Sequence, residues 1–156
     1  MSIDWLTGEE IENYIAKNGN ASTKAAFLGI FAANTLPRQI LQLPALLIVN
    51  SDTANLPGRH WRAVYITTEH YGEIFDSLAA PVNILLEKWI NSVTVRWQIT
   101  TKCVQHPLSP SCGAFVLHFI LNRLTAKSLD NYMQHFSSDL ERNERKIRYF
   151  VQKLKS

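Results

Sequence analysis

The longest apolar run in the sequence, "CGAFVLHFIL" at positions 112–121, most limits how this chain can fold. It has about half of the ~20 residues that a membrane-spanning helix needs, so we expect a buried helix in a globular core. The run follows a Ser-Pro-Ser loop, and its first residue is a cysteine. A thiol at the start of a helix lies near unpaired N–H groups that favour the reactive thiolate.

The chain as a whole has the length and composition of one globular domain. It has 156 residues, of which 46% are hydrophobic and 19% charged, and no linker or repeat divides it. We therefore predict a single domain over residues 1–156. The N-terminus lacks the features of a secretory signal, and two cysteines make no disulfide framework. We expect a protein of a reducing compartment that is neither secreted nor bound to a membrane.

The pattern of apolar residues and turn signals predicts helices at both ends of the chain and strands between them. Thr7 and Glu10 have the spacing of a capping box, so the first helix should run from there to about Asn18. A less regular region rich in small residues follows it. Strands are expected at 46–50, 60–67, 72–77 and 93–100, a turn at 55–58, and helices after Pro81, from Cys112 to about Leu124, at 128–136 and at 139–154.

This order of elements does not alternate as a doubly wound sheet would. It predicts an α+β domain with a central mixed or antiparallel β-sheet packed between helices. The segments 60–67 and 72–77 should form a hairpin, and the odd-numbered residues of 93–100 should face the core. The last helix has an apolar stripe from Ile147 to Leu154. The helix after Pro81 is expected to bury Ile84, Leu85 and Trp89.

The net charge of +3 is concentrated at the C-terminal end. From Ser138 onward the chain carries six basic and three acidic residues, so the rest of the sequence is neutral. A basic helix of this kind favours an acidic partner or nucleic acid. A solvated helix face accounts for the same pattern and is the simpler interpretation.

Four residues could together support nucleophilic catalysis. Cys112 needs a base, and His60 is the best candidate because it opens a predicted strand. Asp76 lies 16 residues later, at the end of the neighbouring strand, where a carboxylate can orient the imidazole. The side-chain amide of Gln105 can donate to a developing oxyanion. Gly113, which has no side chain, would leave room beside the thiol for a substrate backbone.

The motifs "GRHW", "IFDS" and "VQHPLSPSCGAF" resemble the adenain family of adenovirus-type cysteine proteases, in the clan that includes the Ulp/SENP SUMO proteases. The stretches "FLGIF" and "ERNERKIRYFVQKL" extend the resemblance. It implies a papain-like core in which Cys112 is the nucleophile, His60 the base and then the acid, and Asp76 the orienting group. Gln105 and the backbone N–H of Cys112 would form the oxyanion hole. Trp61 would flank the substrate cleft.

The resemblance also implies a biological role. It predicts an endopeptidase that cleaves capsid or core precursors of a virus or virus-like element, at small-residue, glycine-containing sites, during virion maturation. The enzyme would be a monomer in the virion and in the host nucleus or cytoplasm. The sequence requires no cofactor, but relatives suggest a non-covalent activating peptide, and DNA bound by the basic C-terminal helix. A disulfide-linked activator is not expected, because the region near Thr94 has no cysteine.

Three other interpretations remain open. Asp76 followed by Ser77 is closer to the SUMO-protease pattern, which would make the protein a SUMO or ubiquitin-like isopeptidase. A catalytically silent domain that binds a capsid precursor or DNA is a second alternative. The third is a zinc site, but its spacing is unfamiliar and one ligand would lie in the apolar helix. Its ligands would be Cys103, His106, Cys112 and His118.

Overall fold

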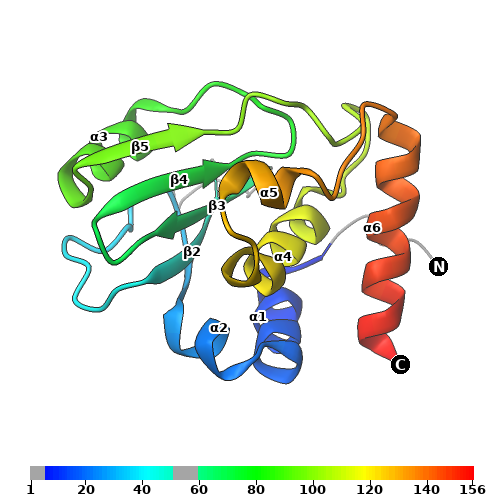
Figure 1. Cartoon of the computed structure of the whole chain (residues 1–156), viewed down its shortest axis with the longest axis horizontal. Helices are drawn as coiled ribbons and strands as arrows, with labels where there is room; N and C mark the ends of the chain where they lie inside the picture. The colour runs from blue at the N-terminus through cyan, green and yellow to red at the C-terminus, as the bar shows by residue number, and fades with distance from the viewer. Residues whose placement is uncertain (1–5, 51–59) are drawn as a thin grey trace.

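The computed structural model describes residues 6–50 and 60–156, and these form one β-sheet with helices on both faces (Figure 1). The elements in chain order are α1 (Gly8–Asn18), α2 (Ala21–Ala26), β1 (Phe27–Phe31), β2 (Ala45–Asn50), β3 (Trp61–Ile66), β4 (Tyr71–Phe75), α3 (Ile84–Val93), β5 (Arg96–Ile99), α4 (Cys112–Asn122), the 3-10 helix η1 (Arg123–Thr125), α5 (Leu129–Met133) and α6 (Leu140–Lys155).

The sheet has five strands in the order β1-β2-β3-β4-β5, and it is mixed. The two outer pairs, β1 with β2 and β4 with β5, are parallel, while the inner strands pair antiparallel. In the β3–β4 hairpin, Ala63 lies opposite Phe75 and Ile66 opposite Gly72. The prediction of an α+β domain with a mixed sheet between helices is therefore confirmed.

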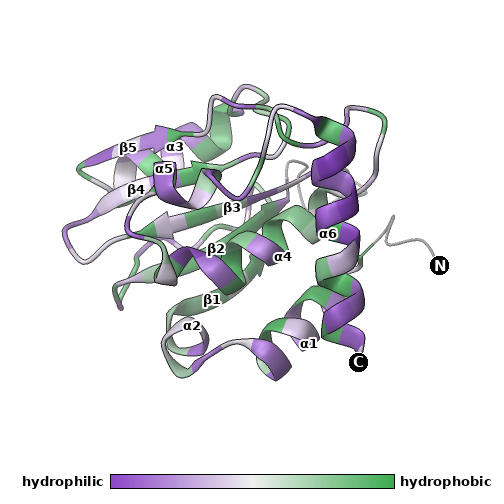
Figure 2. Ribbon diagram, turned by 45° about the vertical axis from the view of Figure 1, so that its right-hand side comes forward, coloured by the Kyte–Doolittle hydropathy of each residue, from purple (hydrophilic) through white to green (hydrophobic). Residues whose placement is uncertain are grey.

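Side chains of the sheet alternate between two cores. In β2, Leu46 and Ile48 face the larger core, which α1, α4 and α6 complete, whereas Leu47 and Val49 face the smaller core under α3. Helix α4 lies between α6 and the sheet (Figure 1), and its residues from Cys112 to Ile120 are all buried. Figure 2 shows α4 largely in the hydrophobic colour. The apolar run thus forms the expected buried helix.

Helix α1 has the predicted capping box, and helix α6 has the predicted apolar stripe. The Thr7 hydroxyl accepts from the Glu10 N–H, and the Glu10 carboxylate accepts from the Thr7 N–H, both at 3.1 Å. This is the predicted capping box. In α6, Ile147 and Val151 are fully buried, and the partly buried Phe150 and Leu154 pack against the same core.

The helix after Pro81 begins later than predicted and presents a different face. The side chain of Asn83 accepts from the Leu86 N–H at 2.8 Å, so the helix starts at Ile84, three residues beyond Pro81. Of the three residues predicted to face the core, Ile84 is 61% exposed and Leu85 40%, while Trp89 is buried as predicted. The buried residues are Leu86, Trp89 and Ile90.

Two further predictions were wrong at their edges. Helix α3 continues through Val93, so β5 is only four residues long and Val95, ahead of it, is 80% exposed. Trp97 and Ile99 do pack partly against the smaller core, as predicted. The region between α1 and β2 is also more regular than predicted. It contains α2 and the parallel strand β1, whose pairing with β2 shifts register at Gly29, where φ is +135°.

The predicted turn at 55–58 lies outside the described residues. None of the helices in the described ranges has both the length and the apolar character that crossing a bilayer requires.

Candidate active site

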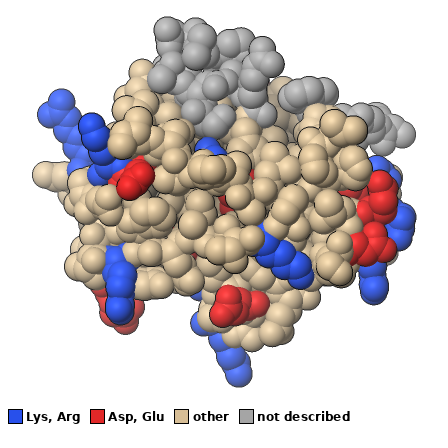
Figure 3. All heavy atoms as spheres, turned by 90° about the horizontal axis from the view of Figure 1, so that it is seen from above, with Lys and Arg blue, Asp and Glu red and all other residues tan. Residues whose placement is uncertain are grey.

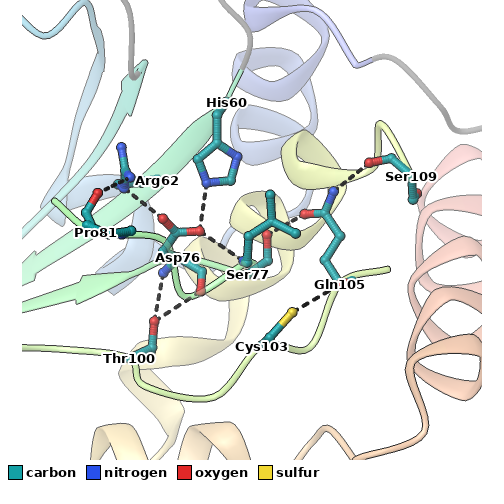
Figure 4. A network of polar contacts seen from close by, with 10 residues as sticks. His60, Arg62, Asp76, Ser77, Pro81, Thr100, Cys103, Gln105 and Ser109 are labelled. Carbon is teal, nitrogen blue, oxygen red and sulfur yellow. Dashed lines mark hydrogen bonds and ion pairs between the residues drawn. The ribbon is translucent and has the colours of Figure 1, made fainter. Parts of the chain in front are cut away.

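The predicted catalytic residues meet where β3 begins, β4 ends and α4 begins. His60 directly precedes β3 and Asp76 directly follows β4, so the antiparallel pairing of these strands brings the two residues to the same edge. The His60 Nε2 lies 2.6 Å from the Asp76 Oδ1 (Figure 4). The sheet therefore positions the imidazole and the carboxylate as a hydrogen-bonded pair.

The Asp76 carboxylate is fully buried, and the protein supplies three donors to it. Besides the contact with His60, its Oδ2 accepts from the Arg62 Nε at 2.8 Å and its Oδ1 accepts from the Leu78 N–H at 2.9 Å. Burial would raise the pKa of Asp76. The hydrogen bond with His60, the positive charges of His60 and Arg62, and the Leu78 N–H outweigh burial and lower this pKa. Asp76 is therefore held as a carboxylate.

Arg62 is a residue that the sequence interpretation missed. It is 4% exposed, and its second guanidinium nitrogen donates to the Pro81 carbonyl at 2.9 Å. The sequence could have indicated this role, because Arg62 is two residues after His60 and residues two apart on a strand point to the same side. Arg62 therefore lies on the side of the sheet toward which His60 and Asp76 also turn.

The imidazole of His60 contacts Asp76 and lines the same cleft as Cys112. Burial lowers the pKa of His60, but the hydrogen bonds with Asp76 and Cys112 and the charges of both outweigh this effect and raise the pKa to about 9. Since Nε2 contacts Asp76, the other ring nitrogen is left for the thiol. A protonated imidazole in this place can stabilise a Cys112 thiolate.

Cys112 is the first residue of α4, as the sequence predicted. The residue before it, Ser111, takes the N-cap position but makes no side-chain cap hydrogen bond. The first-turn N–H groups of α4 are therefore not covered by a capping side chain. A cleft of about 300 Å³ opens over this point. It is lined by His60, Leu78, Gln105, Pro107, Leu108, Ser109, Pro110 and Cys112.

Gln105 lines the same cleft, and hydrogen bonds fix the orientation of its amide. The Ser77 hydroxyl donates to its Oε1 at 2.5 Å, and its Nε2 donates to the Ser109 carbonyl at 2.7 Å (Figure 4). A carboxamide has two N–H donors, and the bond to Ser109 uses one of them. The position agrees with the predicted oxyanion donor, whose role stays a prediction.

Ser77 connects the two halves of the site. Its carbonyl accepts from the backbone N–H groups of Val104 and Gln105 at 2.8 and 3.0 Å, and its hydroxyl orients the Gln105 amide. Asp76, the residue before it, holds His60. Two adjacent residues at the end of β4 therefore set the positions of both the base and the amide.

The structure does not place Trp61 or Gly113 among the residues that line this cleft. A side chain at Gly113 would point toward Leu6 and Ile11, both 3.4 Å away, so the glycine allows α4 to pack against the N-terminal segment. Trp61 packs against the larger core, near Gly8. The reason given for Gly113 was therefore wrong, because position 113 of α4 faces the core.

The ligands of the alternative zinc site do not come together. Within residues 6–50 and 60–156, no three His, Cys, Asp or Glu side chains form a group that could hold a metal ion. Cys103 and Cys112 are free thiols, and Cys103 donates to the Gln105 carbonyl at 3.3 Å. His118 lies in an aromatic cluster, with its Nδ1 2.7 Å from the Tyr132 hydroxyl.

No protein-family model matches this sequence, and no curated protein is significantly similar to it. Solved structures do match. A crystal structure of an ASFV protease is similar over 65% of this chain and 43% of its own, with 20% identity and a TM-score of 0.50. ChlaDub1 from Chlamydia trachomatis is similar over 70% of this chain and 58% of its own, with 17% identity and a TM-score of 0.51.

A third similarity is weaker. The central domain of an uncharacterized Legionella pneumophila protein has 14% identity and a TM-score of 0.46, over 82% of this chain and 88% of its own. This chain thus spans about half the length of the first two structures. At these identities the likeness concerns the fold alone, and at that level it confirms the resemblance drawn from the motifs: the chain has the fold of the adenain/Ulp-type cysteine proteases.

Proposed function

We propose that this protein is a cysteine endopeptidase in which Cys112, His60 and Asp76 form the catalytic triad. One observation carries the proposal. The His60 imidazole is 2.6 Å from a buried carboxylate, and it lines the same open cleft as the Cys112 thiol at the start of a helix. This is the arrangement that thiol catalysis needs, and the protease-type fold supports the same conclusion.

The first half of the reaction forms a thioester. The Cys112 thiolate attacks the carbonyl carbon of the peptide bond, and the carbonyl electrons move onto the oxygen. The His60 imidazolium then gives its proton to the leaving nitrogen as the C–N bond breaks. Asp76 keeps the ring oriented and stabilises its positive charge during these steps.

The second half releases the acid product. The neutral His60 now takes a proton from water, and the resulting hydroxide attacks the thioester carbon, so that the C–S bond breaks and the thiolate is restored. In both halves the carbonyl oxygen becomes negative. The second N–H of the Gln105 amide and the backbone N–H of Cys112 supply the donors for it.

For the substrate, we propose precursor proteins of a virus or virus-like element, cut at small-residue, glycine-containing sites during virion maturation. The motif resemblance is the basis, and the small size of the cleft is compatible with it. The rim is apolar, since Leu78, Pro107, Leu108 and Pro110 border the cleft and Leu108 is 89% exposed. An extended peptide with small residues at the cut and apolar neighbours would fit this surface.

DNA binding by α6 belongs to the same proposal. All six basic side chains between positions 138 and 156 are exposed, whereas Glu144, one of the three acidic ones, is buried. Figure 3 shows one face, on which charged side chains are scattered rather than continuous. A non-covalent activating peptide, a monomeric state and a location in the virion and in the host nucleus or cytoplasm remain proposals of the resemblance.

A second candidate function is removal of SUMO or ubiquitin-like tags. It is favoured by Asp76 with Ser77, where adenovirus enzymes usually have glutamate as the acid. The chemistry at Cys112 would be the same, but the scissile bond would follow the C-terminal glycine of the tag. The two functions differ in whether a short peptide is sufficient as a substrate.

The first test is covalent trapping. The protein is incubated with a short peptide that ends in Gly-Gly and bears an aldehyde or vinyl sulfone, and the adduct is mapped by mass spectrometry, with His60→Ala as the control. We expect modification of Cys112 alone, lost in the control. Equal modification of Cys103 and Cys112 would contradict the proposal. No adduct, even with DNA present, would mean either a missing activator or a silent binding domain.

A further inference from the structure

Helix α6 holds the chain on both sides of Gln105. The Asn143 Nδ2 donates to the Val104 carbonyl at 3.0 Å, and the next residue of the helix, Glu144, accepts from the His106 N–H at 3.0 Å. Both side chains are buried, with exposures of 1% and 7%. Two consecutive residues of one helix therefore bracket the residue whose amide lies in the cleft.

Glu144 also holds the loop that leads to the nucleophile. Its Oε1 accepts from the Ser109 hydroxyl at 2.7 Å and from the Ser111 hydroxyl at 2.8 Å. No ion pair joins this carboxylate to any residue of the described ranges. A buried carboxylate without a cation is costly unless hydrogen bonds satisfy it, and here these donors all come from the segment 106–111.

The contact with Ser111 explains why α4 starts uncapped. A serine at this position normally turns its hydroxyl to the N–H groups of the first helical turn. Here the hydroxyl donates to Glu144 instead, and Ser111 makes no side-chain cap hydrogen bond with the helix. Glu144 thus keeps the Ser111 side chain away from the N–H groups beside Cys112.

We infer that Glu144 is a positioning residue for the oxyanion hole. Through His106, Ser109 and Ser111 it fixes the loop between Gln105 and Cys112, and so sets the distance between the amide donor and the helix N–H. This inference rests on the proposed function, because the oxyanion belongs to the peptidase reaction. It assigns to α6 a part in catalysis that its basic surface does not indicate.

The test compares Glu144→Gln and Glu144→Ala with the wild type on a peptide substrate. The glutamine keeps one acceptor oxygen and the volume, so it protects the fold, while alanine removes every bond to the loop. We expect kcat to fall by about 10-fold to 100-fold, less for glutamine than for alanine, with KM nearly unchanged. The affinity for a peptide aldehyde, whose adduct places an oxyanion in the hole, should fall in parallel.

Alkylation of Cys112 by iodoacetamide separates positioning from general damage. This reaction attacks a saturated carbon and forms no oxyanion, so its rate should stay near the wild-type rate in both variants. An equal loss of alkylation and kcat would overturn the inference, as would an unchanged kcat. The matched control is Glu141→Gln, a carboxylate one turn earlier that is exposed and 3.8 Å from His106, which should behave as the wild type.

A double-mutant cycle with Gln105→Ala makes the assignment specific. If Glu144 acts through the Gln105 amide, Glu144→Gln should cost little more once that amide is absent. Fully additive losses would overturn the inference. Failure of the proposed function is seen separately, in the wild type alone, as no aldehyde adduct and no hydrolysis. An active wild type whose kcat survives both Glu144 substitutions contradicts only the inference.

Discussion

The two halves of the site are built in different ways. The base half is charged and belongs to the sheet, where His60, Arg62 and Asp76 lie at most 16 residues apart in sequence and are aligned by strand pairing. The oxyanion half is a loop, and the groups that hold it come from far along the chain. Glu144 is 38 residues from His106 in sequence.

This difference shows which half depends on tertiary packing. Strand pairing would keep His60 near Asp76 even if the helices shifted, because their relative position is set within one hairpin. The Gln105 loop is held by Ser77 at the end of β4 and also by Asn143 and Glu144 of α6, so its position depends in addition on the packing of this helix. Substitutions in the base half should therefore change the chemistry of the imidazole, and those in the oxyanion half should change geometry.

The largest effect should come from Asp76→Asn. The amide cannot stabilise the imidazolium as a carboxylate does, so kcat should fall on the order of 10³-fold while the protein stays folded. Peptide hydrolysis and a thermal melt measure the two quantities. Asp130→Asn, at an exposed position in α5, is the matched control and should have no effect. A loss under tenfold would mean that Asp76 serves mainly to balance Arg62.

Gln105→Ala should have the next largest effect. Removal of one oxyanion donor typically lowers kcat by about 10²-fold to 10³-fold. Because His60 and Asp76 are untouched, the rate of Cys112 alkylation by iodoacetamide should not change. A parallel loss of alkylation would show that the two halves are not separable.

A smaller effect concerns the pH dependence of stability, and it contrasts the half-buried His60 with the buried His118. Burial, together with the charges of His135 and Lys146, lowers the pKa of His118 from 6.5 to about 3. The stability linked to His118 is complete above pH 6.5 and is lost as the pH falls from 6.5 toward 3. His60, whose pKa is raised from 6.5 to about 9, contributes stability below pH 6.5 that is lost as the pH rises toward 9.

Urea unfolding across this pH range measures both slopes. Each histidine should contribute up to about 1.4 kcal/mol per pH unit on its own side. His118→Phe should flatten the acid side and His60→Ala the alkaline side. If neither substitution changes its slope, the two environments described here are wrong.

The smallest effect is expected for Gly113→Ala. The new methyl group would meet Leu6 and Ile11 at 3.4 Å inside the core, away from the cleft. The free energy of unfolding should change by no more than about 1 kcal/mol, and kcat/KM should stay as in the wild type. Urea unfolding and peptide hydrolysis check this. A large rise in KM would contradict this and indicate that Gly113 does contact the substrate.

Sequence reasoning predicted the parts of the fold that depend on local signals. The capping box at Thr7, the hairpin that leads from His60 to Asp76 and the buried helix from Cys112 follow from spacing and periodicity. The short strand β1 was missed because its partner strand is distant and parallel, so it has no hairpin turn to mark it. The start of α3 was misplaced because Asn83, not Pro81, begins the helix.

The supporting residues of the site were harder to predict. Arg62 follows from the alternation of a strand once His60 is chosen. Asn143 and Glu144 lie on the same face of α6 as the buried Ile147 and Val151, three to eight residues before them. Two polar residues on a face that is otherwise apolar were the signal that the sequence offered. Their partners, however, lie on a loop without periodicity, and only the folded chain shows which loop that is.

The adjacency of Asp76 and Ser77 has one more consequence. Asp76 binds the His60 imidazole and Ser77 binds the Gln105 amide, so two adjacent residues at the end of β4 orient both groups. When thermal motion displaces these two residues, it carries the two groups in the same direction. We therefore expect the distance between the imidazole and the amide to vary less than the position of either group.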